Sequence, residues 1–146
     1  MLEREQVVPA PLGEVFAFFA QARNLERITP PWLRFTVLTP EPIELAVGTR
    51  IAYRLRLHGI PLRWLTRIEE WESGRSFVDR QLRGPYRLWE HRHEFAPLDG
   101  ATVVRDRVRY ALPLGPLGSL AHAAVVRRDL ERIFDFRRDA VRRRLG

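Results

Sequence analysis

Hydrophobic and polar residues alternate from Thr49 to Leu112, and this period of two is typical of β-strands with one covered and one solvated face. Short turn signals interrupt the alternation at His58-Gly59, Ser73-Gly74, Gly84-Pro85-Tyr86 and Asp99-Gly100. Strands joined by such short turns are antiparallel neighbours. The stretch therefore predicts a β-meander.

Other patterns flank the meander. Before it, the sequence predicts a strand over 2–8, a helix over 11–22, a short helix capped by Asn24 and a brief strand over 34–38. After it, from about Gly118 to the end of the chain, apolar residues recur every three or four positions. That spacing indicates a long helix with one apolar face.

The long helix needs an apolar surface to cover, and the inward face of the meander is the large one that remains. We therefore predict an α+β fold in which a strongly bent antiparallel sheet of about seven strands wraps around the C-terminal helix. Two short helices follow the first strand. The 146 residues are enough for a substantial core, so we expect a single domain over 1–146.

The turn positions fix which residues oppose one another, and directly opposed residues share a face. The expected pairs are Tyr53–Trp64, Leu55–Leu62, Thr66–Gln81, Ile68–Asp79, Asp79–His91, Gln81–Trp89, Trp89–Tyr110, His91–Val108 and His93–Asp106. All of them point to the covered side of the sheet.

This covered face is not uniformly apolar. Burying a polar group without a partner costs roughly 1–3 kcal/mol, so the polar residues must pair, hold water or meet a ligand. An apolar cavity with a few convergent polar groups is typical of a small-molecule site. The predicted ligand-binding residues are Tyr53, Trp64, Asp79, Gln81, Trp89, His91, His93, Asp106 and Tyr110.

The histidine pair admits several interpretations. His91 and His93 with Asp79 or Asp106 have the composition of a metal site, but the spacing matches no recognised ligand pattern, so we expect no metal and no other cofactor. The histidines can instead satisfy the two aspartates in an internal polar network. The same pairs can also present an imidazole donor to a ligand.

A catalytic alternative uses His93 with Asp106 as a general acid or base, because a histidine oriented by a carboxylate suits proton transfer near neutral pH. No serine or threonine nucleophile stands in a known motif, which argues against acyl-transfer hydrolysis. We expect a binding protein rather than an enzyme.

Composition excludes several kinds of chemistry. The chain has no cysteine, so disulfides and thiolate chemistry are absent, and its 25 basic residues are all arginine, which excludes a lysine Schiff base. No signal pattern or long apolar run is present, which predicts a soluble cytoplasmic protein with no transmembrane segment.

Arginines dominate the opposite face of the predicted sheet and give the chain a net charge of +7. Without interleaved aromatic residues this face is unsuited to stacking on bases, so no nucleic acid is expected. The alternatives are a solvated face, an anion-binding interaction module, or a homodimer formed through Leu65, Val78 and Leu82. The expected arginines are Arg50, Arg54, Arg56, Arg63, Arg67, Arg80, Arg92, Arg105, Arg107 and Arg109.

The order of elements resembles the helix-grip fold of the START/SRPBCC superfamily, which includes the birch-pollen allergen and polyketide cyclase-like proteins. Motifs that resemble a bacterial ligand-binding subgroup are NLERITPPW (24–32), GIPLRW (59–64), FVDRQLRGPY (77–86), WEHRHEF (89–95) and the stretch Asp106 to Tyr110. The resemblance covers nearly the whole chain.

The resemblance implies a cavity between the long helix and the sheet that holds a small, largely apolar ligand such as a lipid, a polyketide or another cyclic hydrophobe. It also permits a cyclase or dehydratase that needs no metal. Trp32 is expected to close one end of the cavity. Residues 112–120 are expected to form either a lid or a simple turn.

Overall fold

The computed structural model describes residues 1–113 and 120–146. The strands are β1 (Leu2–Val8), β2 (Thr36–Val37), β3 (Arg50–Leu57), β4 (Ile60–Glu72), β5 (Ser76–Arg83), β6 (Leu88–Leu98) and β7 (Ala101–Ala111). The helical segments are α1 (Leu12–Phe19), α2 (Asn24–Ile28), the 3-10 turn η1 (Pro31–Leu33) and α3 (Leu120–Leu145).

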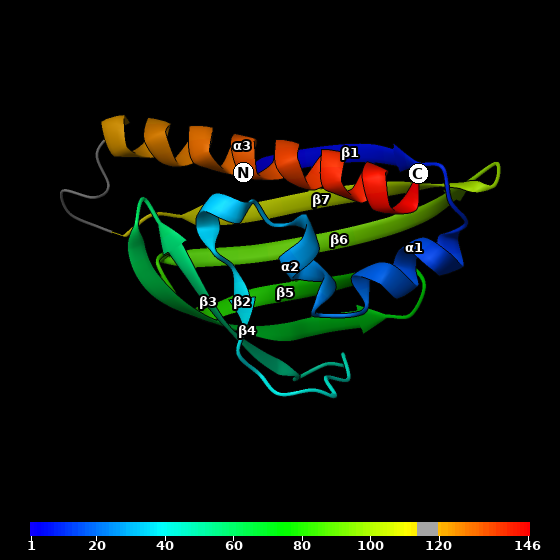
Figure 1. Cartoon of the computed structure of the whole chain (residues 1–146), viewed down its shortest axis with the longest axis horizontal. Coiled ribbons are helices and arrows are strands. Elements are labelled where there is room, and N and C mark those ends of the chain that lie inside the picture. Colours follow the sequence, from blue (N-terminus) through cyan, green and yellow to red (C-terminus); the bar gives the residue numbers. More distant parts are fainter. Residues whose placement is uncertain (114–119) are drawn as a thin grey trace.

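One antiparallel sheet of seven strands, in the order β1-β7-β6-β5-β4-β3-β2, bends around α3 (Figure 1). The long helix lies along the β1–β7 side of the sheet, and α1 and α2 lie in front of the strands that α3 leaves uncovered. The predicted α+β fold is confirmed, including the two short helices after the first strand. Within the described ranges, no helix is long and apolar enough to cross a bilayer.

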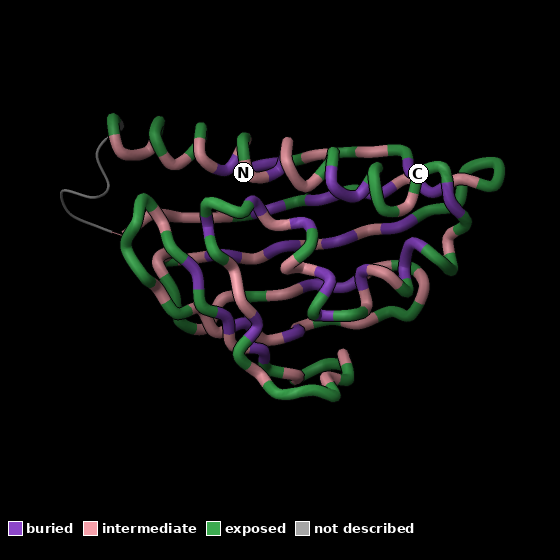
Figure 2. The backbone as a smooth tube through the Cα atoms, viewed as in Figure 1, coloured by how far each residue is buried: buried purple, intermediate pink, exposed green. Residues whose placement is uncertain are grey.

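Buried residues gather between the helices and the concave side of the sheet (Figure 2). On α3, Leu130 and Phe134 pack with Trp89 and Val108 of the sheet. Further along α3, Val141 belongs to a second cluster that α1 and strands β5 to β7 complete. Burial of an apolar face about 100° wide, not helix propensity, holds this arginine-rich helix in place.

Two hairpins form as the turn signals predict. His58 and Gly59 join β3 to β4 with φ of 50° and 80°, and Asp99 and Gly100 join β6 to β7 with φ of 47° and 82°. Two successive residues with positive φ give the backbone twist that matches antiparallel strands, and aspartate-glycine adopts it readily. The registers on both sides of these turns are the expected ones.

The β4–β5 turn is one residue longer than predicted, because Glu72 pairs with Ser76 around Ser73, Gly74 and Arg75. A register shift between Ile68 and Glu70 then restores the expected pairing of Ile68 with Asp79. Such a bulge adds one residue to one strand and so offsets the longer turn. Two deviations of one residue cancel, and the side chains beyond them keep the predicted face.

The β5–β6 connection departs from the predicted three-residue turn. The ladder ends at Arg80 opposite Glu90, so the expected pair Gln81–Trp89 does not form. Gln81 instead donates from Nε2 to the carbonyl of Tyr86 at 2.7 Å and accepts from the Tyr86 amide at 3.2 Å. A Cβ at position 84 would lie 2.5 Å from Gln81 Oε1, so a residue other than glycine would displace the Gln81 side chain from this arrangement.

The first strand has the predicted bounds, whereas the first helix and the brief strand are shorter than predicted and α2 begins one residue earlier. Asn24 is the first residue of α2 rather than its cap, and its side chain donates to the carbonyl of Phe18 at 2.7 Å, which ties α2 to α1. The brief strand begins at Thr36 because Arg34 has a φ of 46°, outside the extended region. Helix α1 ends at Phe19 and not at residue 22.

Candidate functional site

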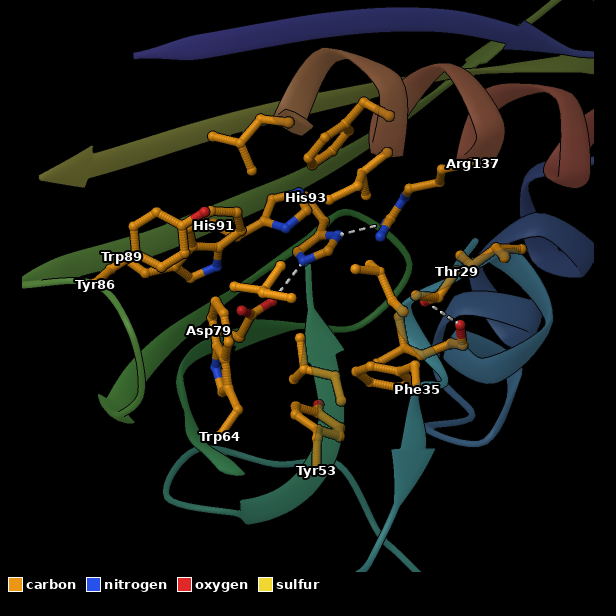
Figure 3. A pocket seen from close by; sticks show the side chains of 18 residues that line it. Thr29, Phe35, Tyr53, Trp64, Asp79, Tyr86, Trp89, His91, His93 and Arg137 are labelled. Atoms are coloured by element: carbon orange, nitrogen blue, oxygen red, sulfur yellow. Dashed lines mark hydrogen bonds and ion pairs between the residues drawn. The ribbon is translucent and has the colours of Figure 1, made fainter. Parts of the chain in front are cut away.

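A cavity of about 150 Å³ lies between the sheet, the α2–η1 segment and α3 (Figure 3). Its surface is mainly apolar, and the side chains of Asp79, His91, His93 and Arg137 bring charge or polarity to it. Leucine and isoleucine residues from α2, η1, β3 and α3 supply much of the rest. The aromatic residues of the lining are Phe35, Tyr53, Trp64, Tyr86, Trp89 and Phe134.

Each histidine in the cavity hydrogen-bonds one aspartate. His91 Nε2 lies 2.7 Å from Asp106 Oδ1, and His93 Nε2 lies 2.6 Å from Asp79 Oδ2. In the backbone register, however, His91 is opposite Asp79 and His93 is opposite Asp106. The hydrogen bonds therefore run along the diagonals of the sheet, within the reach of side chains on one face.

The two imidazole rings stack on one another, with centroids 3.7 Å apart and an angle of 22° between their planes. His93 also stacks on Phe77 at 4.1 Å, and His91 lies edge-on to Phe134 of α3. Both histidines have less than 5% of their surface exposed. Packing on both sides leaves these rings little freedom to rotate.

Arg137 of α3 completes the polar group from the helix side. Its Nη2 lies 3.6 Å from Asp106 Oδ1 and 3.4 Å from His93 Nδ1, and its guanidinium lies over the rings of Phe19 and Phe134. A guanidinium can only donate, so His93 Nδ1 is the acceptor and carries no proton. His93 Nε2 then carries the proton and donates a hydrogen bond to Asp79 Oδ2.

Burial and these contacts set the charges. Burial raises the pKa of the Asp106 carboxyl, but Arg137 and the hydrogen bond from His91 outweigh it and hold that pKa below its usual range. Burial opposes ionisation of Asp79 too, yet the hydrogen bond from His93 keeps its pKa lowered. Burial and the neighbouring His91 lower the pKa of His93 to about 4. At neutral pH the site thus holds two carboxylates and a neutral His93.

Two tyrosines of the cavity keep their protons at any ordinary pH. Burial and the charge of Asp79 raise the pKa of Tyr53, and burial raises that of Tyr86. Both hydroxyls are therefore available to donate a hydrogen bond. Tyr86 lies in the β5–β6 loop that Gln81 braces.

Six of the nine predicted ligand-binding residues line the cavity, namely Tyr53, Trp64, Asp79, Trp89, His91 and His93. The other three support them from behind. Gln81 braces the loop of Tyr86, Asp106 holds His91, and Tyr110 packs against the ring of Tyr86. The expected face of every predicted residue is correct, while a role in ligand binding stays a prediction.

Sequence reasoning missed Arg137 and Tyr86. Arg137 belongs to the spacing 130, 134, 137, 141, in which every other residue is apolar and buried, and an arginine on a buried stripe is the signal that could have revealed it. For Tyr86 the sequence predicts a place in the turn Gly84-Pro85-Tyr86, which gives no sign that its ring faces the cavity. Trp32 does not line the cavity; it is half-exposed and packs on Phe136, with Arg132 over its ring.

Asp79, His91 and His93 each bring one potential ligand atom within 4.8 Å of the others, which is close enough for a small cation. Their hydrogen bonds already use Nε2 of both histidines, and the guanidinium of Arg137 beside His93 would repel a metal ion. The expectation that the site works without a metal stays a prediction.

Several arginines of the outer face pair with carboxylates of other strands of the sheet. Five of the ten pair with glutamates within 4.0 Å, and β1, which lies beside β7, supplies Glu3 and Glu5 for two of them. Val78 cannot serve a dimer contact, because it is 2% exposed and its two cross-strand neighbours, Glu70 and Arg92, form an ion pair across it. The suggested lid falls mostly on residues 114–119, outside the described residues.

Comparisons with known proteins agree with this architecture. A family model described as polyketide cyclase / dehydrase and lipid transport matches residues 8–138. The search of curated proteins finds no match. The chain superposes on solved structures of low sequence identity, which bear on the fold alone.

Three of these structures illustrate the likeness. The Zhui aromatase/cyclase from Streptomyces sp. R1128 is 19% identical, with a TM-score of 0.69 over 99% of this chain and 92% of that one. A START superfamily protein from Mycobacterium smegmatis is 12% identical, with a TM-score of 0.73 over 99% and 95%. A protein from Thermus thermophilus is 22% identical, with a TM-score of 0.67 over 96% and 95%.

Proposed function

Because the chain belongs to the polyketide cyclase / dehydrase and lipid transport family of the START/SRPBCC helix-grip superfamily, we propose that it binds a compact, largely apolar ligand in the cavity under α3. The family implies either hydrophobic ligand binding or polyketide cyclase activity. The observation that carries the proposal is a mainly apolar, aromatic-walled cavity on which the side chains of Asp79, His91, His93 and Arg137 converge.

The size of the cavity narrows the kind of ligand. A cavity of about 150 Å³ has room for roughly one ring, since an engineered apolar cavity of that order takes up benzene. A two-chain lipid would need the helix and sheet to separate. The volume thus supports a cyclic hydrophobe over a lipid with long acyl chains.

Uptake of toluene tests the proposal, and filling the cavity should weaken this uptake. Ile133 of α3 is half-buried and lines the cavity, so in Ile133→Trp the indole should occupy the space of the ligand. We expect toluene binding, measured from chemical-shift changes of the protein, to weaken by about tenfold or more, which corresponds to the loss of one buried ring contact of roughly 1.4 kcal/mol.

Val125→Trp is the matched control, because Val125 lies on the same helix and is 50% exposed. That variant should bind toluene like the unmodified protein. Absence of toluene binding in the unmodified protein, or equal binding by Ile133→Trp, would contradict the proposal.

Acid–base catalysis on such a ligand is the second candidate, favoured by the hydrogen bond from His91 to Asp106. His91 lines the cavity, while Asp106 behind it is held as a carboxylate, and a histidine oriented in this way can transfer protons. Mass spectrometry of a linear poly-β-ketone incubated with the protein would detect the loss of water on cyclisation. Turnover that His91→Gln removes, with toluene uptake intact, would establish the enzyme over the binding protein.

A further inference from the structure

The two aspartates of the site differ in what faces them. Asp106 accepts a hydrogen bond from His91 and lies 3.6 Å from the guanidinium of Arg137. Within the described residues, the donor that contacts Asp79 is His93, which hydrogen-bonds to Oδ2. Asp106 is thus balanced by a full positive charge beside it, while Asp79 is paired with an imidazole.

The carboxylate of Asp79 is open to the cavity. Its side chain keeps 20% of its surface accessible although it lies deep between sheet and helix, and it belongs to the cavity lining. Figure 3 shows this carboxylate between His93 and the indole of Trp64. The accessible part of Asp79 therefore faces the space in which a ligand would lie.

The charge of this carboxylate is not neutralised by its partner. The pKa of Asp79 is lowered, so the group is ionised, and the pKa of His93 is about 4, so the imidazole is neutral at pH 7. An ionised carboxylate in an apolar cavity is costly unless a cation or several donors meet it. The cavity lining therefore includes a carboxylate whose hydrogen-bond partner is a neutral imidazole.

Aromatic rings surround the same space. Trp64 lies beside Asp79 and contacts Trp89 and Tyr86, with ring centroids 5.2 and 5.7 Å away, and Tyr53 stands on the adjacent strand β3. The faces of these rings carry partial negative charge and attract cations, most strongly when water is excluded. The carboxylate of Asp79 and the aromatic rings therefore both favour a positively charged ligand group.

Arg137 does not offer a competing anion site of equal quality. Its guanidinium is directed to Asp106 and His93 and lies over the rings of Phe19 and Phe134. An anionic ligand at this guanidinium would lie close to the carboxylate of Asp106. It would also approach the ionised Asp79.

We propose that the cavity selects a compact ligand that carries a positively charged amine on an apolar, ring-sized body, with the amine against Asp79 and the body between the aromatic rings. This inference rests on the proposed binding of an apolar ligand and names its class. An ammonium group would donate to the open carboxylate oxygen and contact the ring faces at the same time.

Four probes of one size test the charge preference, namely toluene, benzyl alcohol, benzylamine and benzoate. At pH 7.5 we expect benzylamine to bind about tenfold to a hundredfold more tightly than toluene, as a hydrogen bond to a charged group suggests, and benzoate to bind least. Isothermal titration calorimetry on the full chain gives the four affinities.

In Asp79→Asn the affinity for benzylamine should fall to that for toluene, because asparagine still accepts the hydrogen bond from His93 but carries no charge. Asp99→Asn is the matched control: it removes one carboxylate at an exposed hairpin, where asparagine also adopts positive φ. That variant should keep the preference.

Each alternative result overturns a different statement. If none of the four probes binds, the proposed function itself fails. If toluene binds and benzylamine is no tighter, the apolar cavity stands and the amine inference is wrong. Benzyl alcohol as tight as benzylamine would make Asp79 the acceptor for a neutral hydroxyl, and benzoate as the tightest probe would make Arg137 the recognition group. The affinities of the four probes for the unmodified protein test the amine inference even if Asp79→Asn does not fold.

Discussion

Arg137→Met is expected to lower the free energy of unfolding by about 3 kcal/mol, because it leaves the buried Asp106 without its cation. Methionine preserves the apolar stem that packs between Phe19 and Phe134. The loss should therefore come mainly from charge and not from volume. Urea unfolding at pH 7, followed by tryptophan fluorescence, measures it.

The double variant Arg137→Met with Asp106→Asn separates charge from packing. Removing both charges should recover part of the loss, because an uncompensated buried carboxylate no longer remains. Arg138→Met is the control at the next position, where the side chain is 49% exposed; it should change stability by less than about 0.5 kcal/mol. Strict additivity of the two single losses would show that Arg137 and Asp106 do not interact.

Turn arithmetic predicted the faces of the sheet because side-chain direction in a strand depends only on parity and register. The pairs Tyr53–Trp64, His93–Asp106 and Trp89–Tyr110 are all present. The wrong turn length at Ser73 did not change the predicted faces, because a bulge of one residue compensates for it. The residues of the covered face could therefore be predicted from the sequence alone.

The hydrogen-bond partners within the site could not be predicted from the sequence, because side-chain torsions and the rotation of α3 determine them. Register places His91 opposite Asp79, yet its hydrogen bond goes diagonally to Asp106. Arg137 enters from α3, and the rotation of a helix over a sheet follows from packing rather than from strand parity. The glutamates of β1 pair with outer arginines because β1 lies beside β7, a neighbour that no short turn specifies.

Acidification should destabilise the protein between pH 6.5 and about 4, and His93 should account for about 3 kcal/mol of the loss. In the folded state burial lowers the pKa of His93 to about 4, whereas the unfolded chain has the ordinary value near 6.5. The unfolded chain therefore binds a proton that the folded protein excludes. Stability is full above pH 6.5 and falls as the pH drops towards 4.

The carboxylates of Asp79 and Asp106 also lose stabilising free energy on acidification, but in a lower pH range. The pKa values of Asp79 and Asp106 are lowered from 3.8 by folding, so their contribution is present above that pH and is lost as the pH falls through the folded values. The free energy of unfolding should thus decrease in two pH stages. The groups that face His93, namely Asp79, His91, Asp106 and Arg137, all bear on the first stage.

His93→Gln isolates the first stage. Glutamine can donate to Asp79 but has no proton to take up, so the slope of stability against pH between 6.5 and 4 should decrease by the share of His93. Chemical unfolding at intervals of half a pH unit gives this slope, and the slope rather than the absolute stability is compared because the stacking on Phe77 is also lost. An unchanged slope in His93→Gln would mean that His93 is not held neutral between Asp79 and Arg137, and the charge balance of the cavity would have to be redrawn.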